Sequence, residues 1–228
     1  IRLSLVGSEM CIRDRLDDKG SGKIDRVIID TKDVRSRFIV ESPMHFNVWD
    51  KIIRKEILDH NCIRFPEQVA YEDIYFGALL HLYVRKVAYV DAIYYHYYIN
   101  PASTVLKKEA AYHGDIITVN EMLVETLKER GFWETYQKSL EIDLLFIWYL
   151  ATVKIICLRF EKPPYEMFCR LKRSILFYIP ECLKNPYIPV YMKEFYQLLL
   201  KLLEIEVTPP VLDQVAEQYK QYVQTYEG

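Results

Sequence analysis

The chain has 228 residues, of which 51% are hydrophobic and 14% aromatic, and its formal net charge is −2. This length fits one large domain or two small ones, and the hydrophobic share suits a substantial core. A pI of about 6.3 gives no overall positive field, so nucleic acid is not an expected partner.

The first fifteen residues do not resemble the rest of the chain. Residues 4–15 read SLVGSEMCIRDR, and this string resembles, without a mismatch, the translated sequencing-adapter peptide that contaminates gene predictions. Such segments are set aside before the fold is considered. We therefore expect residues 1–15 to be non-native, Leu16 to be the approximate first authentic residue, and the sequence before it to be lost.

Residues 16–106 are predicted to mix strands and helices. Turn-forming residues predict a loop at 18–23, and β-branched or aromatic runs predict strands at 26–30 and 38–40 and one or two strands at 87–99. Apolar residues at helical spacing predict amphipathic helices at 49–60 and 71–84.

Residues 107–228 are predicted to form a separate all-α domain. Long stretches with helical periodicity are interrupted at Gly131, 163–164, 186–189 and 209–210, which predicts roughly five helices and almost no strand. The longest apolar run, 144–153, is shorter than the ~20 residues that a membrane span needs, and we expect a buried core helix there.

The five cysteines carry no metal-binding or redox motif. They have neither a CxxC pair nor Cys/His metal spacing. Because they are odd in number and scattered, we expect reduced, buried thiols in a cytoplasmic protein, with peripheral contact at the inner face of the plasma membrane as an open alternative. The residues are Cys11, Cys62, Cys157, Cys169 and Cys182.

Three motifs follow one another in the α/β part. Residues 47–51 read NVWDK, residues 65–66 read FP and are followed by YEDIYF at 71–76, and residues 95–104 read YHYYINPAST. In order and spacing they resemble the distal half of bacterial family-2 glycosyltransferases of the GT-A fold. That family reads N-x-W-[ND]-K, then F-P, then E-D-x-x-F, then L-Y-Y-Y-R-x-N-P-x-S.

The resemblance implies that residues 16–106 are the acceptor-side, C-terminal part of a GT-A (Rossmann-like) catalytic domain. The parent enzyme would transfer a sugar, with inversion, from a nucleotide-sugar donor to a surface glycan, a cell-envelope polysaccharide or a lipid-linked acceptor. Without its donor-binding half, the chain is expected to be inactive.

A sugar transfer with inversion needs a base that takes a proton from the acceptor hydroxyl, and the resemblance assigns this role to Asp73, with Glu72 beside it. The alternative is that both carboxylates only complement the dipole of their helix.

Four further residues are candidates for substrate binding through the same resemblance: Asn47, Trp49, Lys51 and Tyr97. Trp49 would stack on an acceptor sugar or fill the core. Lys51 would offset donor phosphate charge or lie on a solvated helix face.

The family also holds Mg²⁺ or Mn²⁺, whose charge neutralises the leaving diphosphate. The resemblance places its DxD motif before residue 16, because Asp17 and Asp18 lie at the junction without a preceding strand. His96 is a candidate metal ligand or a packed strand histidine. Tyr98 and Ala102 stand where the family has Arg and Gly, and the first change removes a possible phosphate contact.

A different class of function remains open, namely a non-catalytic helical interaction or membrane-docking module. Residues 154–173 carry six basic side chains against two acidic ones, and such a face either contacts anionic lipid or is simply solvated. Oligomerisation through the Tyr-rich helices is a third option. The basic residues are Lys154, Arg159, Lys162, Arg170, Lys172 and Arg173.

Overall fold

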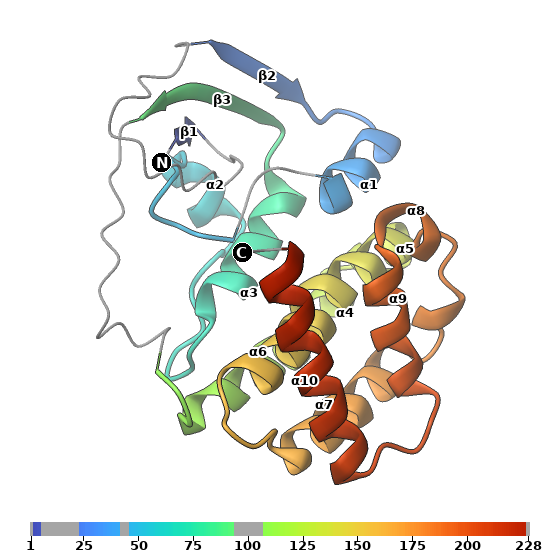
Figure 1. The fold of residues 1–228 in the computed structure, drawn as a ribbon. Coiled ribbons are helices and arrows are strands. Elements are labelled where there is room, and N and C mark those ends of the chain that lie inside the picture. The colour runs from blue at the N-terminus through green and yellow to red at the C-terminus, as the bar shows by residue number, and fades with distance from the viewer. Residues whose placement is uncertain (1, 6–22, 42–45, 94–106, 227–228) are drawn as a thin grey trace. The chain divides into compact units, whose positions relative to one another are not determined.

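The computed structural model describes residues 2–5, 23–41, 46–93 and 107–226 (Figure 1). The chain divides into two compact units, residues 1–100 and 101–228, and each is described by itself. The domain boundary expected after residue 106 lies in the segment 94–106, outside the described residues.

The strands of the first unit form an antiparallel sheet in the order β1-β3-β2. In β2, Ile24 pairs with Val90 of β3 and Ile28 pairs with Lys86. Strand β1 lies within residues 1–15, which the sequence predicts to be non-native. Whether this segment is non-native stays a sequence-based prediction. No parallel pair occurs among the described strands, so they do not by themselves show a Rossmann-like layer. The strands are β1 (Arg2–Leu5), β2 (Ile24–Ile28) and β3 (Lys86–Ile93).

Helix α3 (Glu72–Tyr83) is the central element of the first unit. The helix predicted at 71–84 is thereby confirmed. Tyr71, with φ of 65° and ψ of 24°, precedes the helix in the left-handed conformation, and Val84 follows it in an extended one. Every residue from 76 to 82 is buried, so this helix supplies much of the unit's core.

Two predictions in the first unit were wrong. Residues 38–40 lie in helix α1 (Lys32–Glu41) instead of a strand, because Phe38 and Ile39 are buried on that helix. The Thr31 hydroxyl accepts a hydrogen bond from the Val34 amide at 3.2 Å and caps the helix start. The second helix begins only at residue 55, as α2 (Lys55–His60). Residues 49–50 form a turn and 51–54 are irregular, so the NVWDK motif does not open a helix.

Helices α1 and α3 pack through a polar contact surrounded by aromatic rings. The buried Arg35 guanidinium donates to the His81 carbonyl at 2.6 Å. The His81 ring meets Phe38 and Phe46 edge-on, with ring centroids 5.6 and 5.4 Å apart. Gly77 lies against Phe46, and this close approach is possible because glycine has no side chain.

The described residues of the second unit form helices without a strand, which confirms the all-α prediction for 107–226. There are more helical segments than the five expected (Figure 1). The α-helices are α4 (Asp115–Glu129), α5 (Phe132–Leu144), α6 (Ala151–Leu158), α7 (Tyr165–Tyr178), α8 (Ile188–Tyr191), α9 (Glu194–Leu200) and α10 (Pro209–Tyr226). Short 3-10 turns are η2 (Ala111–Gly114), η4 (Cys182–Lys184) and η5 (Lys201–Leu203), and η3 (Leu145–Leu150) is a π-helix.

Three helix breaks fall where the sequence predicts them, whereas residues 188 and 189 of the break predicted at 186–189 lie in helix α8. Gly131, with φ of 72°, separates α4 from α5, a conformation that glycine adopts without steric cost. Pro164 precedes α7, and α10 begins at Pro209, because proline is tolerated only at the start of a helix.

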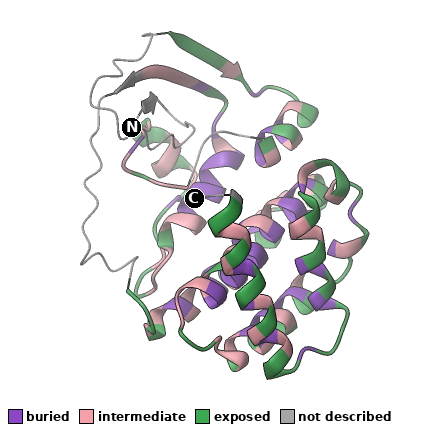
Figure 2. Ribbon diagram, in the orientation of Figure 1, coloured by how far each residue is buried: buried purple, intermediate pink, exposed green. Residues whose placement is uncertain are grey.

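The apolar run 144–153 is a buried helix, as predicted, and its middle is the π-helix η3. Trp148 and Tyr149 of η3 are both 0% exposed. The Tyr149 hydroxyl donates to the Leu199 carbonyl at 2.7 Å and so ties the core to α9. Figure 2 shows the buried sides of the helices facing inward in this unit, with exposed residues along the outer side of α10.

The expectation that all cysteines are buried was only partly right. Cys157 and Cys182 are buried, whereas Cys62 is exposed and Cys169 is intermediate. Burial raises the pKa of both the Cys157 and the Cys182 thiol to about 12, so these two stay protonated. Cys11 lies outside the described residues. Among the described helices, none is long and apolar enough to cross a membrane.

Candidate functional site

The proposed base, Asp73, lies in the first turn of α3. The Ile74 amide donates to the Asp73 carboxylate Oδ1 at 3.0 Å and to the Tyr71 carbonyl at 3.1 Å. The left-handed conformation of Tyr71 turns the chain sharply into the helix. The carboxylate is thereby fixed at a helix start, where amide groups and the helix dipole favour negative charge.

The electrostatic surroundings nevertheless oppose ionisation of Asp73. Burial raises the pKa of its carboxyl above the usual value, and the neighbouring Glu72 charge raises it further. The hydrogen bond from the Ile74 amide and the positive charge of Lys51 act in the opposite direction and are the weaker influences. A carboxylate whose pKa is moved toward neutrality is a better proton acceptor near pH 7.

A buried ion pair lies within electrostatic reach of Asp73. The side chains of Asp50 and Lys51 are each 1% exposed, and the Lys51 ammonium donates to the Asp50 carboxylate and to the Asn47 carbonyl. Burial lowers the pKa of Lys51, while Asp50 and Asp73 raise it. The sequence therefore folds the NVWDK segment into a turn closed by its own lysine.

The structure brings some of the predicted site residues together and leaves others apart. Lys51 and Asp73 interact through their charges, and Asn47 contributes a backbone carbonyl to Lys51. The Lys51 side chain faces Asp50 within the turn and is 1% exposed, so it does not lie on a solvated helix face, and its contact with donor phosphate stays a prediction. Trp49 lies in the turn and is partly exposed, and Glu72 is exposed.

The predicted residues Tyr97 and His96, together with Tyr98 and Ala102, lie in the segment 94–106, outside the described residues. Asp17 and Asp18 also lie outside them. Within the described parts of the chain, no three His, Cys, Asp or Glu side chains are grouped so that they could hold a metal ion. The Mg²⁺ or Mn²⁺ that the resemblance implies stays a sequence-based prediction, because its motif and His96 lie outside the described residues.

Apolar side chains on the same segments are exposed. Val48 is 36% exposed, Ile52 65% and Phe65 43%. Phe65 stacks on Phe76 of α3, with ring centroids 4.2 Å apart and planes 10° apart. An exposed ring and exposed aliphatic groups suit contact with the apolar face of a ligand.

Sequence reasoning singled out Lys51 and missed its partner, Asp50. Asp50 is 1% exposed as a residue, and a buried acidic side chain is rare unless it is paired. The adjacent Asp-Lys sequence by itself gives no such signal, because neighbouring opposite charges are common on protein surfaces.

A second perturbed carboxyl lies in the helical unit. Burial raises the pKa of Asp143 to about 8. Asp143 is near the end of α5, just before the π-helix η3. The sequence showed only an acidic residue flanking an apolar run.

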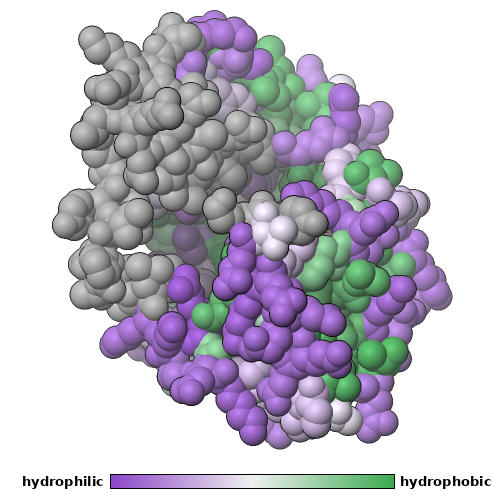
Figure 3. All heavy atoms as spheres, viewed as in Figure 1, coloured by the Kyte–Doolittle hydropathy of each residue, from purple (hydrophilic) through white to green (hydrophobic). Residues whose placement is uncertain are grey.

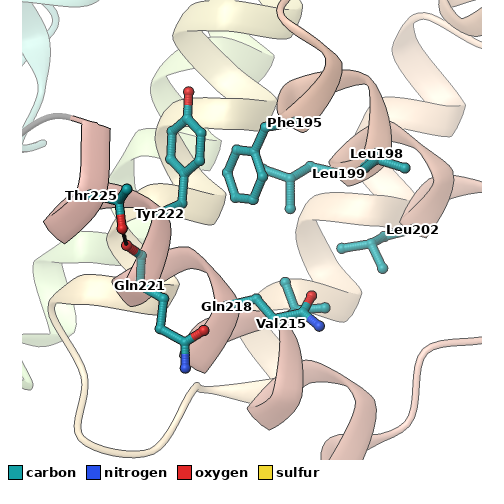
Figure 4. A pocket seen from close by; sticks show the side chains of 9 residues that line it. All are labelled: Phe195, Leu198, Leu199, Leu202, Val215, Gln218, Gln221, Tyr222 and Thr225. Carbon is teal, nitrogen blue, oxygen red and sulfur yellow. Dashed lines mark hydrogen bonds between the residues drawn. The ribbon is translucent and has the colours of Figure 1, made fainter.

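The helical unit also carries an open groove of about 540 Å³ between α9 and α10 (Figure 4). In Figure 3 hydrophobic surface lies beside α9, while the visible surface of α10 is mostly hydrophilic. No charged side chain is among the lining residues, so the groove is not suited to a phosphate. It is lined by Phe195, Leu198, Leu199, Leu202, Val215, Gln218, Gln221, Tyr222 and Thr225.

Two of the six basic side chains considered for membrane docking are engaged inside the helical unit. Arg170 pairs with Glu121 at 2.9 Å and donates to the Thr118 hydroxyl at 3.0 Å. Lys172 donates to the backbone carbonyls of Leu202 and Ile205. These contacts tie α7 to neighbouring segments, so the basic stretch is not a uniformly available cationic face.

Comparisons of the chain with protein-family models, with curated proteins and with solved structures found no match.

Proposed function

We propose that residues 16–106 are the acceptor side of an inverting, nucleotide-sugar-dependent glycosyltransferase, with Asp73 as the general base. The observation that carries the proposal is the placement of Asp73, a partly buried carboxylate fixed at the start of α3 with its pKa raised. Burial and the Glu72 charge outweigh the contacts at the helix start that would lower its pKa, and such perturbed carboxylates are frequent at functional sites. The raised pKa supports the catalytic alternative.

In the proposed reaction, the Asp73 carboxylate takes the proton of an acceptor hydroxyl. The hydroxyl oxygen forms a bond to the anomeric carbon of the donor sugar, from the face opposite the leaving group. The bond from that carbon to the nucleoside diphosphate breaks, and the diphosphate leaves with the electron pair. Exposed Phe65 and Val48 would contact the acceptor.

The proposal is tested in two steps. Long reads across the source locus first establish the reading frame upstream of Leu16. In the protein encoded by that frame, Asp73→Asn should lower sugar transfer at least about 100-fold without changing the circular dichroism spectrum. Asp59→Asn is the matched control, because Asp59 is an exposed helix carboxylate paired with Arg64. Full turnover in Asp73→Asn would remove this residue from the mechanism.

The second candidate function is a non-catalytic helical interaction module. The observation that favours it is that residues 107–226 pack around their own core and carry an uncharged open groove. This alternative predicts that residues 107–228 fold when expressed alone and bind a partner independently of nucleotide sugars. An upstream frame that lacks a donor-binding domain would favour it over the enzyme.

A further inference from the structure

The groove between α9 and α10 has an apolar wall whose residues recur at heptad spacing. Phe195, Leu198 and Leu202 follow one another at steps of three and four residues along α9 and η5, and all three line the groove. Leu198 is 57% exposed. Apolar residues at such steps form the seam along which one helix packs against another. In the described part of the chain this seam stays open to solvent.

Helix α10 turns a seam of the same spacing toward the same groove. Val215, Gln218, Tyr222 and Thr225 line the groove at steps of three, four and three residues. Figure 4 shows these side chains across from the leucines of α9. We call the two sets of residues together the α9–α10 seam. Two helices that face one open groove in this way leave room for further helices to complete a bundle.

The groove is already formed in the single chain. The buried Tyr149 hydroxyl donates to the Leu199 carbonyl at 2.7 Å and fixes the backbone of α9. The Phe195 and Tyr222 rings stack with their centroids 3.9 Å apart and their planes 5° apart, which joins the start of α9 to the end of α10. Because these walls are fixed before any partner arrives, little conformational freedom is lost when one packs there.

The charges of the α9–α10 seam indicate which partner it fits. None of the residues that line the groove is charged, and Glu217 and Lys220, also on α10, pair with each other at 2.8 Å. At a two-fold axis between identical chains the same surface patch meets itself, so a charged seam would repel its own copy and an uncharged one does not. The seam also carries both an exposed leucine, Leu198, and a groove that can receive one. A second copy of this chain matches both features.

We propose that two copies of the chain associate through the α9–α10 seam about a two-fold axis. The two helix pairs then pack as a four-helix arrangement, and Leu198 of each copy lies against the groove of the other. The inference goes beyond the proposed function, because it concerns the helical unit and does not depend on sugar transfer.

The test is sedimentation equilibrium of the full 228-residue chain over a range of concentrations, with a reducing agent so that the exposed Cys62 forms no disulfide between copies. We expect a dimer whose fraction rises with concentration. Leu198→Glu should raise the dimer dissociation constant at least about 30-fold, as for a central residue of an interface. Val190→Glu is the matched control, because Val190 of α8 is 68% exposed and does not line the groove, and its dissociation constant should be that of the parent chain. A chain that stays monomeric at every concentration, or a dimer that Leu198→Glu leaves intact, would overturn the proposal.

A second pair of variants covers the case in which Leu198→Glu does not fold. Gln218 is exposed on α10, so Gln218→Glu and Gln218→Lys should both fold, which circular dichroism checks. Each variant alone should weaken the dimer, and an equimolar mixture should restore it, because opposite charges then lie in the same seam. A mixture that associates no better than either variant alone would refute the two-fold seam.

Hydrogen exchange locates the contact independently of any substitution. Amides of α9 and α10 should exchange more slowly at high than at low protein concentration. Concentration-dependent protection that is confined to the first unit would place the interface elsewhere and overturn the proposal.

Discussion

Phe65 and Phe76 stack with their ring centroids 4.2 Å apart, and each belongs to a different short motif of the sequence. Phe65 begins the Phe-Pro motif, and Phe76 ends the E-D-x-x-F motif on α3. The stack anchors the extended segment before Asp73 to the helix that carries it. The two motifs are therefore joined by packing, which gives a physical reason for their occurrence in series.

We predict that the two rings of this stack differ in their contribution to stability. Phe76 is 5% exposed and Phe65 is 43% exposed. Phe76→Ala should therefore lower the free energy of unfolding by about 3–5 kcal/mol, whereas Phe65→Ala should lower it by about 1 kcal/mol. Urea unfolding, followed by tryptophan fluorescence and NMR signals of the first unit, measures both. Equal losses would show that the stack is not arranged as described.

Gly77→Ala should destabilise the first unit. A Cβ atom at this position would lie 2.6 Å from Phe46 Cδ1 and 3.0 Å from Phe46 Cα, and relief of such a clash costs about 1–3 kcal/mol. Gly114→Ala is the control, because nothing lies within 4 Å of a Cβ atom there and its φ of −70° suits any residue. A melting temperature that falls only in Gly77→Ala would agree with the prediction.

Asp143 should make stability depend on pH. Its folded-state pKa is raised to about 8, whereas an unfolded Asp titrates near ~3.9, so the folded state binds more protons between these values. Stability should therefore fall as pH rises through this window and be lowest above about pH 8.

Asp143→Asn should remove this dependence and be more stable than the parent chain at pH 8, by about 1 kcal/mol or more. Glu129→Gln, at an exposed position near the end of α4, serves as the control and should keep the parental pH profile. Thermal unfolding at pH 5 and pH 8 distinguishes the variants. A parental pH profile in Asp143→Asn would place the titrating group elsewhere.

Removal of the Tyr149 hydroxyl should lower the free energy of unfolding more than removal of the Tyr165 hydroxyl. The Tyr149 hydroxyl donates to the Leu199 carbonyl at 2.7 Å in a fully buried setting, and Tyr149→Phe should cost about 1–2 kcal/mol. The Tyr165 hydroxyl makes a similar bond to the Val207 carbonyl at 2.9 Å in a partly buried one, where water can replace it, and Tyr165→Phe should cost about 0.5 kcal/mol. Denaturant unfolding of the two variants provides the comparison.

Local chemistry was sufficient to predict several elements. Helix α3 follows from its apolar spacing and its acidic first turn, and the helix breaks at Gly131, Pro164 and Pro209 follow from the backbone preferences of glycine and proline. Each of these features depends on residues adjacent in the chain. The acidic pair at the start of α3 was identified in the same way, from Glu72 and Asp73 themselves.

Other features depend on residues that meet only in the folded chain. Residues 38–40 have strand-forming side chains, yet they are helical, because Phe38 and Ile39 are buried in helix α1 and burial outweighs a propensity of at most ~1 kcal/mol. Cys62 and Cys157 have similar sequence surroundings and opposite exposure. Periodicity reports which side chains are apolar along one element, and it does not report what covers them.

The sequence by itself determined the helical character of 107–226, the breaks between its helices and the acidic start of α3, because each is set by backbone preference and local periodicity. Only the tertiary structure decided that Lys51 is buried against Asp50 and that burial raises the pKa of Asp73. A pKa depends on desolvation and on charges within a few ångströms. Those distances are set by folding and not by the spacing of residues along the chain.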